Sequence, residues 1–561
     1  MRITRIALTL AVLAPMGLKA QEDVKQQLAE LKRQVLVLEE KAKDQEKTLT
    51  KVESKVAQDN IAWGGDLRTR DDVTTWHFKP YQQFMGFVQN PAMGPSNPYP
   101  FMPMTQQMPA QDYSNPVAWS TRLRLKMNIN INENAKIMGR LTMYKVHGGA
   151  DTPIFNGSPN TVQNSFNDTK IPTNDVLRVE RASFVYDFPK VGVLSIGRQN
   201  TSDGPPLEVR EGTERQATPQ ALAVNALVDG IGWKFHLDGL GLPEHSLLGL
   251  CYGVGYESGF GGGGLVKSNY APVGFNFSNA TVANPGAAVM QVNAIGPLKD
   301  TTVLGVMLDL PLLFEALGTV HAANLYLGYN KFGNMTDIPF GDLTNFPVPA
   351  QPGMGGLPSV QCVTATNNLG DMDQFTATWK HKVGDTFTYF GSYGYIKSHP
   401  NGKSSQYGAY WDMPAQMGGP NTQLTGFGGL LGDANHSQTA SAYYLGMCWD
   451  PVESLGMGLE YNHGSPRWFT YSPATGEAEE KLGTRGNVVE AYLDWQFVKN
   501  VHLRVGYLDY AFSHAFSGWH IAPAPMSGSW ESAYNLDNNP MLQYASPSGI
   551  KDTYISLEVR F

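Results

Sequence analysis

Residues 120–132, STRLRLKMNININ, alternate between apolar and polar side chains at every position. One phase of the alternation holds Leu123, Leu125 and Met127, and the other holds Arg122, Arg124 and Lys126. A period of two predicts a β-strand. Because one face is apolar along the whole segment, the strand must separate an apolar medium from a polar one.

Sixteen segments with such alternation follow one another between residues 61 and 561. Long connections rich in Pro, Gly, Asn and Ser fall at 73–116, 148–175, 200–228, 258–297, 331–369, 398–437, 463–486 and 512–549. The turns between them are short, as in NENA at 132–135 and PKVG at 189–192. Outer-membrane β-barrels have short turns at one end and long loops at the other, whereas a soluble β-sandwich does not sort its loops this way. We therefore expect an all-β fold, an antiparallel transmembrane barrel of 16 strands over residues 59–561, with 18 strands as the alternative.

The composition agrees with a barrel. Only 16% of the residues are charged and 59 are Gly, which is typical of strands joined by many turns. No run approaches the roughly 18 consecutive apolar residues of a transmembrane helix. The mean hydropathy of -0.27 is compatible with a membrane barrel, because the apolar residues occupy alternate positions.

The N-terminal 58 residues differ from the rest. Arg2 and Arg5 precede an apolar stretch and the small residue Ala20, which predicts a signal peptide over 1–20. Residues 21–58 contain no Gly, Pro or aromatic residue and repeat apolar side chains at heptad spacing, which predicts a coiled coil. Its core positions are compatible with two or three helices, and we expect a periplasmic stalk that holds a homotrimer. The alternative is a single helix against the barrel rim.

The polar phase of the first three strands is rich in bases. We predict that it lines the pore with Arg68, Arg70, Arg122, Arg124, Lys126, Lys136 and Arg140. Only two acids, Asp66 and Asp72, share these inward positions, which leaves a local excess of five positive charges. In the segment 176–188, Arg178, Glu180 and Arg181 cannot all share one face unless the strand contains a bulge.

Several phrases resemble Gram-negative outer-membrane porins. RASFVYDF at 181–188 and VGVLSIGRQ at 191–199 resemble the paired fourth and fifth strands of general porins, and GLEYNHGSPRWF at 458–469 resembles a late porin strand. The chain ends with the aromatic residue Phe561 directly after an alternating strand. This end resembles the C-terminal signature that barrel-assembly machinery recognises in outer-membrane proteins. The whole chain is similar to a little-characterised porin-like family with an N-terminal coiled coil.

The resemblance implies passive diffusion of small hydrophilic solutes or ions across the outer membrane of a Gram-negative bacterium. It also implies that the loop at 200–228 folds into the lumen as a constriction. The charged residues of that loop are Asp203, Glu208, Arg210, Glu211, Glu214 and Arg215. The acids of this loop, opposite the bases of the early strands, would create an electric field across the lumen, which the two arginines of the loop would weaken. The alternative is a loop that lies at the surface.

Two other functions remain open. The barrel could be a sleeve for a periplasmic multihaem cytochrome in an electron conduit, or the stalk could tether the membrane to peptidoglycan. The sequence has no GxSxG motif, no ordered catalytic set, no metal-ligand spacing and no CxxCH motif. The three cysteines, Cys251, Cys362 and Cys448, form no disulfide framework. We therefore expect a non-enzyme without metal or cofactor that binds the lipid bilayer and no nucleic acid.

Overall fold

The computed structural model of the chain describes the following residues: 41, 61–89, 101–147, 177–200, 208–209, 222–224, 227–256, 272–276, 289–292, 299–316, 318–336, 368–403, 429–470, 481–514, 517, 520 and 547–561. The chain divides into two units, Met1–Ala62 and Trp63–Phe561. Nearly all of the first unit, including the expected signal peptide and coiled coil, lies outside the described residues.

Twenty strands lie in the described residues, and sixteen of them form one closed antiparallel barrel. Around the ring the order is β1 (Ile61–Phe78), β20 (Gly549–Arg560), β19 (Val501–Phe512), β18 (Gly486–Val498), β17 (Leu455–Gly464), β16 (Thr439–Val452), β15 (Phe387–Pro400), β14 (Asn368–Val383), β13 (Thr319–Thr336), β12 (Thr301–Ala316), β9 (Leu247–Tyr256), β8 (Leu227–His236), β7 (Gly192–Asn200), β6 (Arg178–Phe188), β5 (Ala135–Val146) and β4 (Gln111–Asn130). The predicted fold and strand count are confirmed. Among the described residues no helix has the length and apolar character to cross a membrane.

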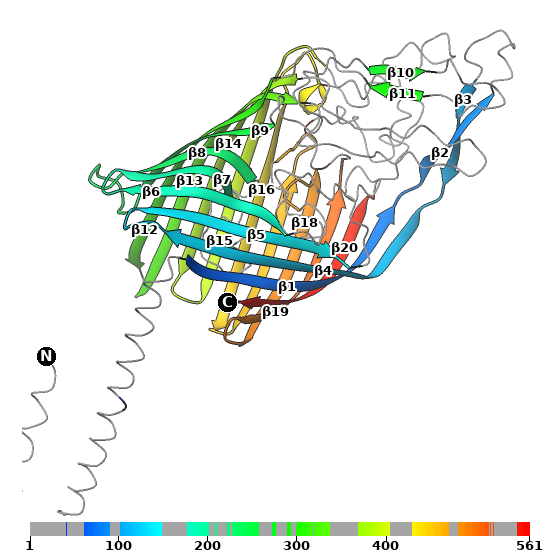
Figure 1. Cartoon of the computed structure of the whole chain (residues 1–561). Coiled ribbons are helices and arrows are strands. Elements are labelled where there is room, and N and C mark those ends of the chain that lie inside the picture. The colour runs from blue at the N-terminus through cyan, green and yellow to red at the C-terminus, as the bar shows by residue number, and fades with distance from the viewer. Residues whose placement is uncertain are drawn as a thin grey trace, which may run out of the picture. The chain divides into compact units, whose positions relative to one another are not determined.

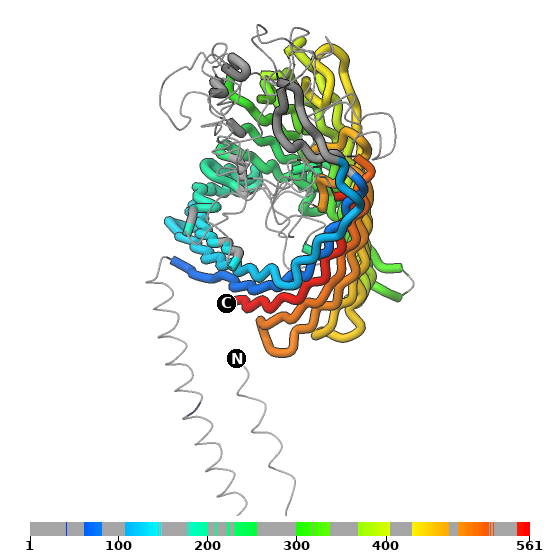
Figure 2. The backbone as a smooth tube through the Cα atoms, turned by 90° about the vertical axis from the view of Figure 1, so that its right-hand side faces the viewer, coloured from blue at the N-terminus to red at the C-terminus, as the bar shows by residue number. Residues whose placement is uncertain are grey.

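Closure brings the first and last barrel strands together (Figures 1 and 2). β1 pairs antiparallel with β20, from Asp66 opposite Arg560 to His77 opposite Gly549. A closed ring has no free sheet edge, so every strand finds hydrogen-bond partners on both sides.

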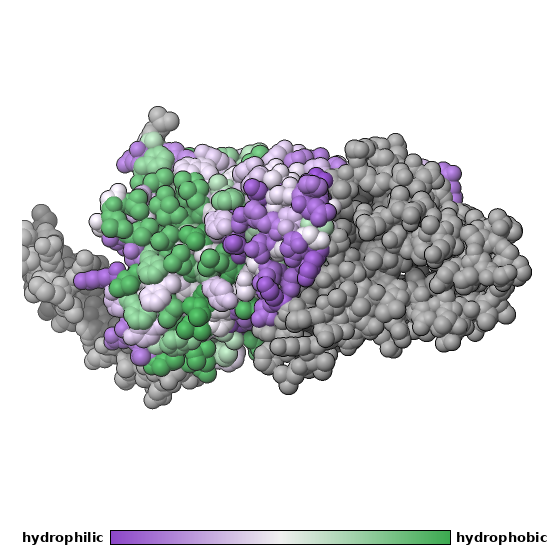
Figure 3. All heavy atoms as spheres, turned by 90° about the horizontal axis from the view of Figure 1, so that it is seen from above, coloured by the Kyte–Doolittle hydropathy of each residue, from purple (hydrophilic) through white to green (hydrophobic). Residues whose placement is uncertain are grey.

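The apolar and polar phases of the strands point to opposite faces of the barrel. On β20, Ile555 and Leu557 are 48% and 37% exposed, whereas Ser556 and Glu558 between and beside them are 4% and 3% exposed. The exposed set forms a broad apolar band on the outer face, with a hydrophilic band beside it (Figure 3). The buried set faces the interior, and on β20 it includes the carboxylates of Asp552 and Glu558.

Aromatic and histidine side chains lie at both ends of the apolar band. The outward positions of β14 run from Asp373 and Phe375 at one end to Trp379 and His381 at the other, and Phe375 packs on Tyr329 with ring centroids 4.9 Å apart. From Asp373 to His381 the strand rises about 27 Å, or about 20 Å along the barrel axis at a 40° tilt. That height is close to the roughly 25 Å apolar band, flanked by aromatic girdles, of outer-membrane barrels.

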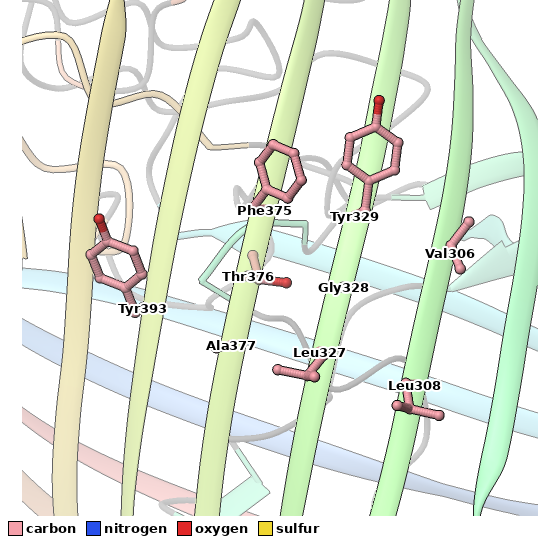
Figure 4. Close-up of a pocket in the computed structure, with 9 residues that line it drawn as sticks. All are labelled: Val306, Leu308, Leu327, Gly328, Tyr329, Phe375, Thr376, Ala377 and Tyr393. Atoms are coloured by element: carbon pink, nitrogen blue, oxygen red, sulfur yellow. The ribbon is translucent and has the colours of Figure 1, made fainter.

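An open depression of about 390 Å³ lies within this band (Figure 4). Its lining residues are Val306, Leu308, Leu327, Gly328, Tyr329, Phe375, Thr376, Ala377 and Tyr393. Ala377, at an outward position of β14, leaves part of this space because its side chain is small. The depression faces outward among apolar side chains and so is unsuited to a hydrophilic solute.

Two of the expected loops contain strands. Within 73–116, β1 continues to Phe78, β4 begins at Gln111, and β2 (Tyr81–Gln89) pairs with β3 (Phe101–Met108). Within 258–297, β10 (Pro272–Asn276) pairs with β11 (Val289–Val292). These paired segments were not predicted, because backbone pairing between the two arms of a hairpin does not require apolar and polar side chains to alternate.

Candidate functional site: the charged inner wall

A strip of buried ionisable side chains runs along the inner wall over β4, β1, β20, β19, β18 and β17. This charged strip consists of Asp66, Arg68, Arg70, Asp72, Arg122, Arg124, Glu460, Lys481, Glu490, Arg504, Asp552 and Glu558. All twelve are less than 7% exposed, and acids and bases are equal in number among these described residues. Charges buried to this extent are stable only when they are paired and hydrogen-bonded.

One cluster of the charged strip joins β4, β1 and β20. Asp66 accepts hydrogen bonds from Arg122 Nη2 at 3.0 Å and from Arg124 Nε at 2.8 Å. Arg122 Nη2 also donates to Glu558 Oε2 at 3.3 Å. Arg560 Nε donates to the other Glu558 oxygen at 2.7 Å. Each of these arginines therefore has a carboxylate partner within the wall.

A second cluster lies further along the same strands. Arg70 contacts Asp72 at 2.5 Å and Asp552 at 3.2 Å. Its guanidinium carbon lies 3.8 Å from the ring centroid of Tyr554, a cation–π contact. The hydroxyl of Tyr554 donates to Glu490 Oε1 at 2.8 Å, so this cluster continues towards β18.

The third cluster contains a lysine that does not come from a strand. Lys481 lies just before β18, and its ammonium contacts both Glu460 and Glu490. The Lys481–Glu490 distance is 2.6 Å, and Tyr444 donates its hydroxyl to Glu460 Oε2 at 2.5 Å. All three charged groups are almost fully buried.

The predicted bulge in the fourth strand is confirmed. Arg140 on β5 lies opposite Arg181 on β6, while the next residue, Leu141, lies opposite Val179, so Glu180 is the extra residue. The bulge lets Glu180 turn inward, where its Oε1 contacts Arg140 Nη2 at 2.5 Å. Arg140, which was predicted to line the pore, is therefore paired with the carboxylate of Glu180.

Described parts of the 200–228 segment contact the inward side chains of β14. Glu208 is 4% exposed, and its Oε1 contacts Lys380 Nζ at 2.7 Å. The carbonyl of Ala223 accepts a hydrogen bond from Gln374 Nε2 at 3.1 Å. Leu222 and Ala223 have no exposed surface and pack in an apolar cluster with Met372 and Trp468. We call Glu208 and residues 222–224 the loop anchor.

The loop anchor and the early-strand arginines lie on opposite sides of the ring. β14 and β4 are separated by eight steps in either direction around the sixteen strands. The lumen between them is therefore bounded by the Lys380–Glu208 pair on one side and by Arg122 and Arg124 on the other.

The remaining predicted site residues are placed as follows. Lys126 on β4 is half-buried, and Lys136 on β5 is exposed near the short-turn end. Phe561 is 62% exposed, and its backbone exchanges hydrogen bonds with Gly65 at 2.8 and 3.0 Å. Asp203, Arg210, Glu211, Glu214 and Arg215 lie outside the described residues.

The acids that balance these bases were not predicted as site residues. Glu460, Glu490 and Asp552 occupy inward positions of late strands, and their polar phase was a sufficient signal for each of them. Their closeness to β1 and β4 is not visible in the sequence, because it arises only when the ring closes and brings the first and last strands together. In the described part of the chain no group of three or more His, Cys, Asp or Glu side chains is arranged to hold a metal ion.

Several solved structures are similar to this chain at low sequence identity. The loop L8 deletion mutant of OmpT from Vibrio cholerae is 10% identical, with a TM-score of 0.36, over 89% of this chain and 99% of that chain. The outer membrane channel DcaP of Acinetobacter baumannii is 12% identical, with a TM-score of 0.36, over 89% and 97%. OprB of Pseudomonas putida is 8% identical, with a TM-score of 0.40, over 90% and 96%. The barrel of this chain is established by its own strand pairing.

Sequence comparison assigns the chain to one protein family. No curated protein sequence matches the chain. Residues 112–561 match the model of a family described as "Protein of unknown function (DUF3373)". That match covers β4 to β20 and therefore most of the barrel. The chain belongs to the DUF3373 family.

Proposed function

We propose that the protein is an outer-membrane porin through which small hydrophilic solutes or ions diffuse passively. The observation that carries the proposal is the combination of an apolar outer band with a charged inner wall on one closed barrel of sixteen strands. Membrane barrels of 16 to 18 strands enclose an aqueous channel. The aromatic side chains that flank the outer band support placement in a bilayer.

The loop anchor supports a narrowed lumen. Glu208 and Ala223 bond to Lys380 and Gln374, which point inward from β14. A loop held there reduces the free cross-section and faces the arginines of β4 across the lumen. A sleeve for a cytochrome would need a wide interior, so these contacts favour the diffusion channel over the sleeve.

The proposal includes a homotrimer joined through residues 21–58. Heptad repeats with β-branched core residues are compatible with three helices. Recognition of Phe561 by the barrel-assembly machinery also belongs to the proposal, since its backbone completes the β1–β20 pairing next to Gly65.

The direct test is the conductance of the purified protein in planar bilayers. We expect discrete current steps, and reversal potentials in a salt gradient will give the ion preference. Replacing the anchor pair by Glu208→Gln and Lys380→Gln together removes its ion pair without changing net charge, so the conductance of each step is expected to rise.

The control is Lys551→Ala, since Lys551 points outward from β20 and is exposed. Its conductance is expected to equal that of the unchanged protein. If a folded barrel, judged by its heat-dependent migration on a denaturing gel, never gives current steps, the channel proposal is wrong.

A further inference from the structure

Two glutamates of the inner wall lie directly opposite each other. Glu460 on β17 pairs with Glu490 on β18, and both point inward. Side chains directly opposite in an antiparallel pair have Cβ atoms about 5 Å apart, and like charges at this spacing repel. The strands therefore build a site of two carboxylates that requires a cation between them.

In the structure, the ammonium of Lys481 is that cation. Its Nζ contacts Glu460 Oε2 and Glu490 Oε2, and it lies 5.0 Å from the ring centroid of Tyr444. One oxygen of the site, Glu460 Oε1, is buried and has no hydrogen-bond partner in the described part of the chain. Glu460 Oε1 can therefore accept a further N–H donor.

The site is built by the barrel, whereas its cation comes from the connection between β17 and β18. The two tyrosines that complete it, Tyr444 on β16 and Tyr554 on β20, donate to Glu460 and Glu490 respectively. Lys481 is held through its backbone, because Asn462 Nδ2 donates to the Lys481 carbonyl at 3.0 Å. Its neighbour Leu482 accepts a hydrogen bond from the Trp468 indole at 2.9 Å.

We propose that this part of the wall is a binding site for primary ammonium groups, filled in the present structure by the tethered side chain of Lys481. The inference rests on the proposed channel function and narrows its solute class to linear primary amines. The site offers carboxylate oxygens to the N–H donors and an aromatic face to the positive charge. A quaternary ammonium ion has no N–H donor and cannot replace Lys481.

The tether explains why the site is occupied without a solute. A group on a short linker acts at an effective concentration on the order of millimolar, so a free amine must exceed that concentration to displace it. When an amine does so, Lys481 leaves the wall, and residues 481–485 lose one of their attachments. The bound solute thereby loosens the connection that leads into β18.

The test uses n-butylammonium chloride, which has the same four-carbon chain and ammonium as a lysine side chain. In Lys481→Ala, n-butylammonium is expected to reduce the single-channel current at about tenfold lower concentration than in the unchanged protein, because no tethered group competes. Tetramethylammonium at the same ionic strength serves as the probe without an N–H donor. Lys551→Ala is the matched lysine control, and the added substitution Glu460→Gln is expected to abolish the n-butylammonium effect.

A second measurement does not depend on current. The midpoint of heat-dependent gel migration reports folding of the barrel, and n-butylammonium is expected to raise it for Lys481→Ala but not for Lys551→Ala. If Lys481→Ala folds poorly, n-butylammonium during refolding is expected to restore the folded band. If the protein gives no current but n-butylammonium still raises the midpoint for Lys481→Ala, the channel proposal is wrong and the ammonium site is retained. Equal effects of n-butylammonium and tetramethylammonium on the midpoint or on refolding of Lys481→Ala overturn the ammonium site.

Discussion

At the scale of the residue, Asp66 determines how much charge the arginines of β4 present to the lumen. It accepts hydrogen bonds from Arg122 and Arg124, so the predicted positive wall is a set of ion pairs. Selectivity then depends on which member of a pair is removed, since the other member remains as an uncompensated charge.

We therefore expect opposite effects from Asp66→Asn and Arg124→Gln. The first exposes positive charge and shifts the reversal potential towards anions, and the second shifts it towards cations. Each is expected to lower the free energy of unfolding by about 3–5 kcal/mol, because a buried partner loses its pair.

Combining the two substitutions checks the pairing. The double variant is expected to have a reversal potential close to that of the unchanged protein and a smaller loss than the sum of the single losses. Reversal potentials in bilayers and urea unfolding followed by tryptophan fluorescence supply both quantities. Additive effects would contradict the assignment of a coupled pair.

Gly506 is required for the position of Tyr554. A Cβ atom at Gly506 would lie 2.4 Å from Tyr554 Cζ, so the ring lies over the glycine and reaches Glu490 beyond it. Gly506→Ala is expected to lower the free energy of unfolding by about 1–3 kcal/mol, as in other overpacked sites. The matched control is Gly391→Ala, whose new Cβ would contact only the flexible end of Leu445 at 3.2 Å. Equal losses for the two variants in urea unfolding would contradict this role.

At the scale of the element, connections far apart in the sequence pack together at the long-loop end of the barrel. The ring of His520 bonds through Nε2 to the carbonyl of Thr336 at the end of β13, and the His520 carbonyl accepts the Leu431 amide at 2.7 Å. Burial, together with the positive charge of Arg485, lowers the pKa of His520 to about 4. The packed state therefore requires a neutral imidazole.

This packing is expected to weaken in acid. Between the usual histidine pKa of about 6.5 and the lowered value of about 4, the released segment binds a proton that the packed segment does not. Stability of the contact is therefore lost as the pH falls through this window. Hydrogen exchange of the Leu431 amide, corrected for its intrinsic pH dependence, should lose protection between pH 7 and 4.5. The variant His520→Gln should show no such change, and a loss of the same size there would exclude the histidine as its cause.

The barrel strands could be predicted at this scale because each has one face towards an apolar medium, which imposes a period of two. The bulge at Glu180 was visible for the same reason, as an interruption of that period. The hairpin of β2 and β3 was not visible, because its sequence YQQFMGFVQ and FMPMTQQM lacks the alternation. The site around Lys481 was not visible either, because it joins a connection to several strands through contacts that no local pattern indicates.

At the scale of the whole molecule, the number of strands could be predicted but their side-chain partnerships could not. Alternating loop lengths determine an even count, since every strand reverses direction. The pair Arg122–Glu558 joins residues 436 positions apart, and no local pattern indicates it. Only closure of the ring places them together.

The stalk predicted over 21–58 gives a test of assembly. Deleting these residues, with the export signal kept, is expected to leave a folded barrel and to reduce the trimer to monomers. Light scattering after size-exclusion chromatography measures the mass, and heat-dependent gel migration confirms the fold. A trimer that survives the deletion would show that the barrels associate through another surface.

The pairing of β1 with β20 also bears on how freely the lumen can evolve. Asp66 lies opposite Arg560 and Arg68 opposite Glu558, so a slip of two residues in either direction would place like charges together, either Arg68 with Arg560 or Asp66 with Glu558. The same side chains that face the solute thus favour the correct register between the first and last strands. A mutation that alters solute preference here also alters the accuracy of barrel closure. We therefore expect relatives with new solute preferences to differ at positions away from this pairing, such as Lys380 or the connection that carries Lys481.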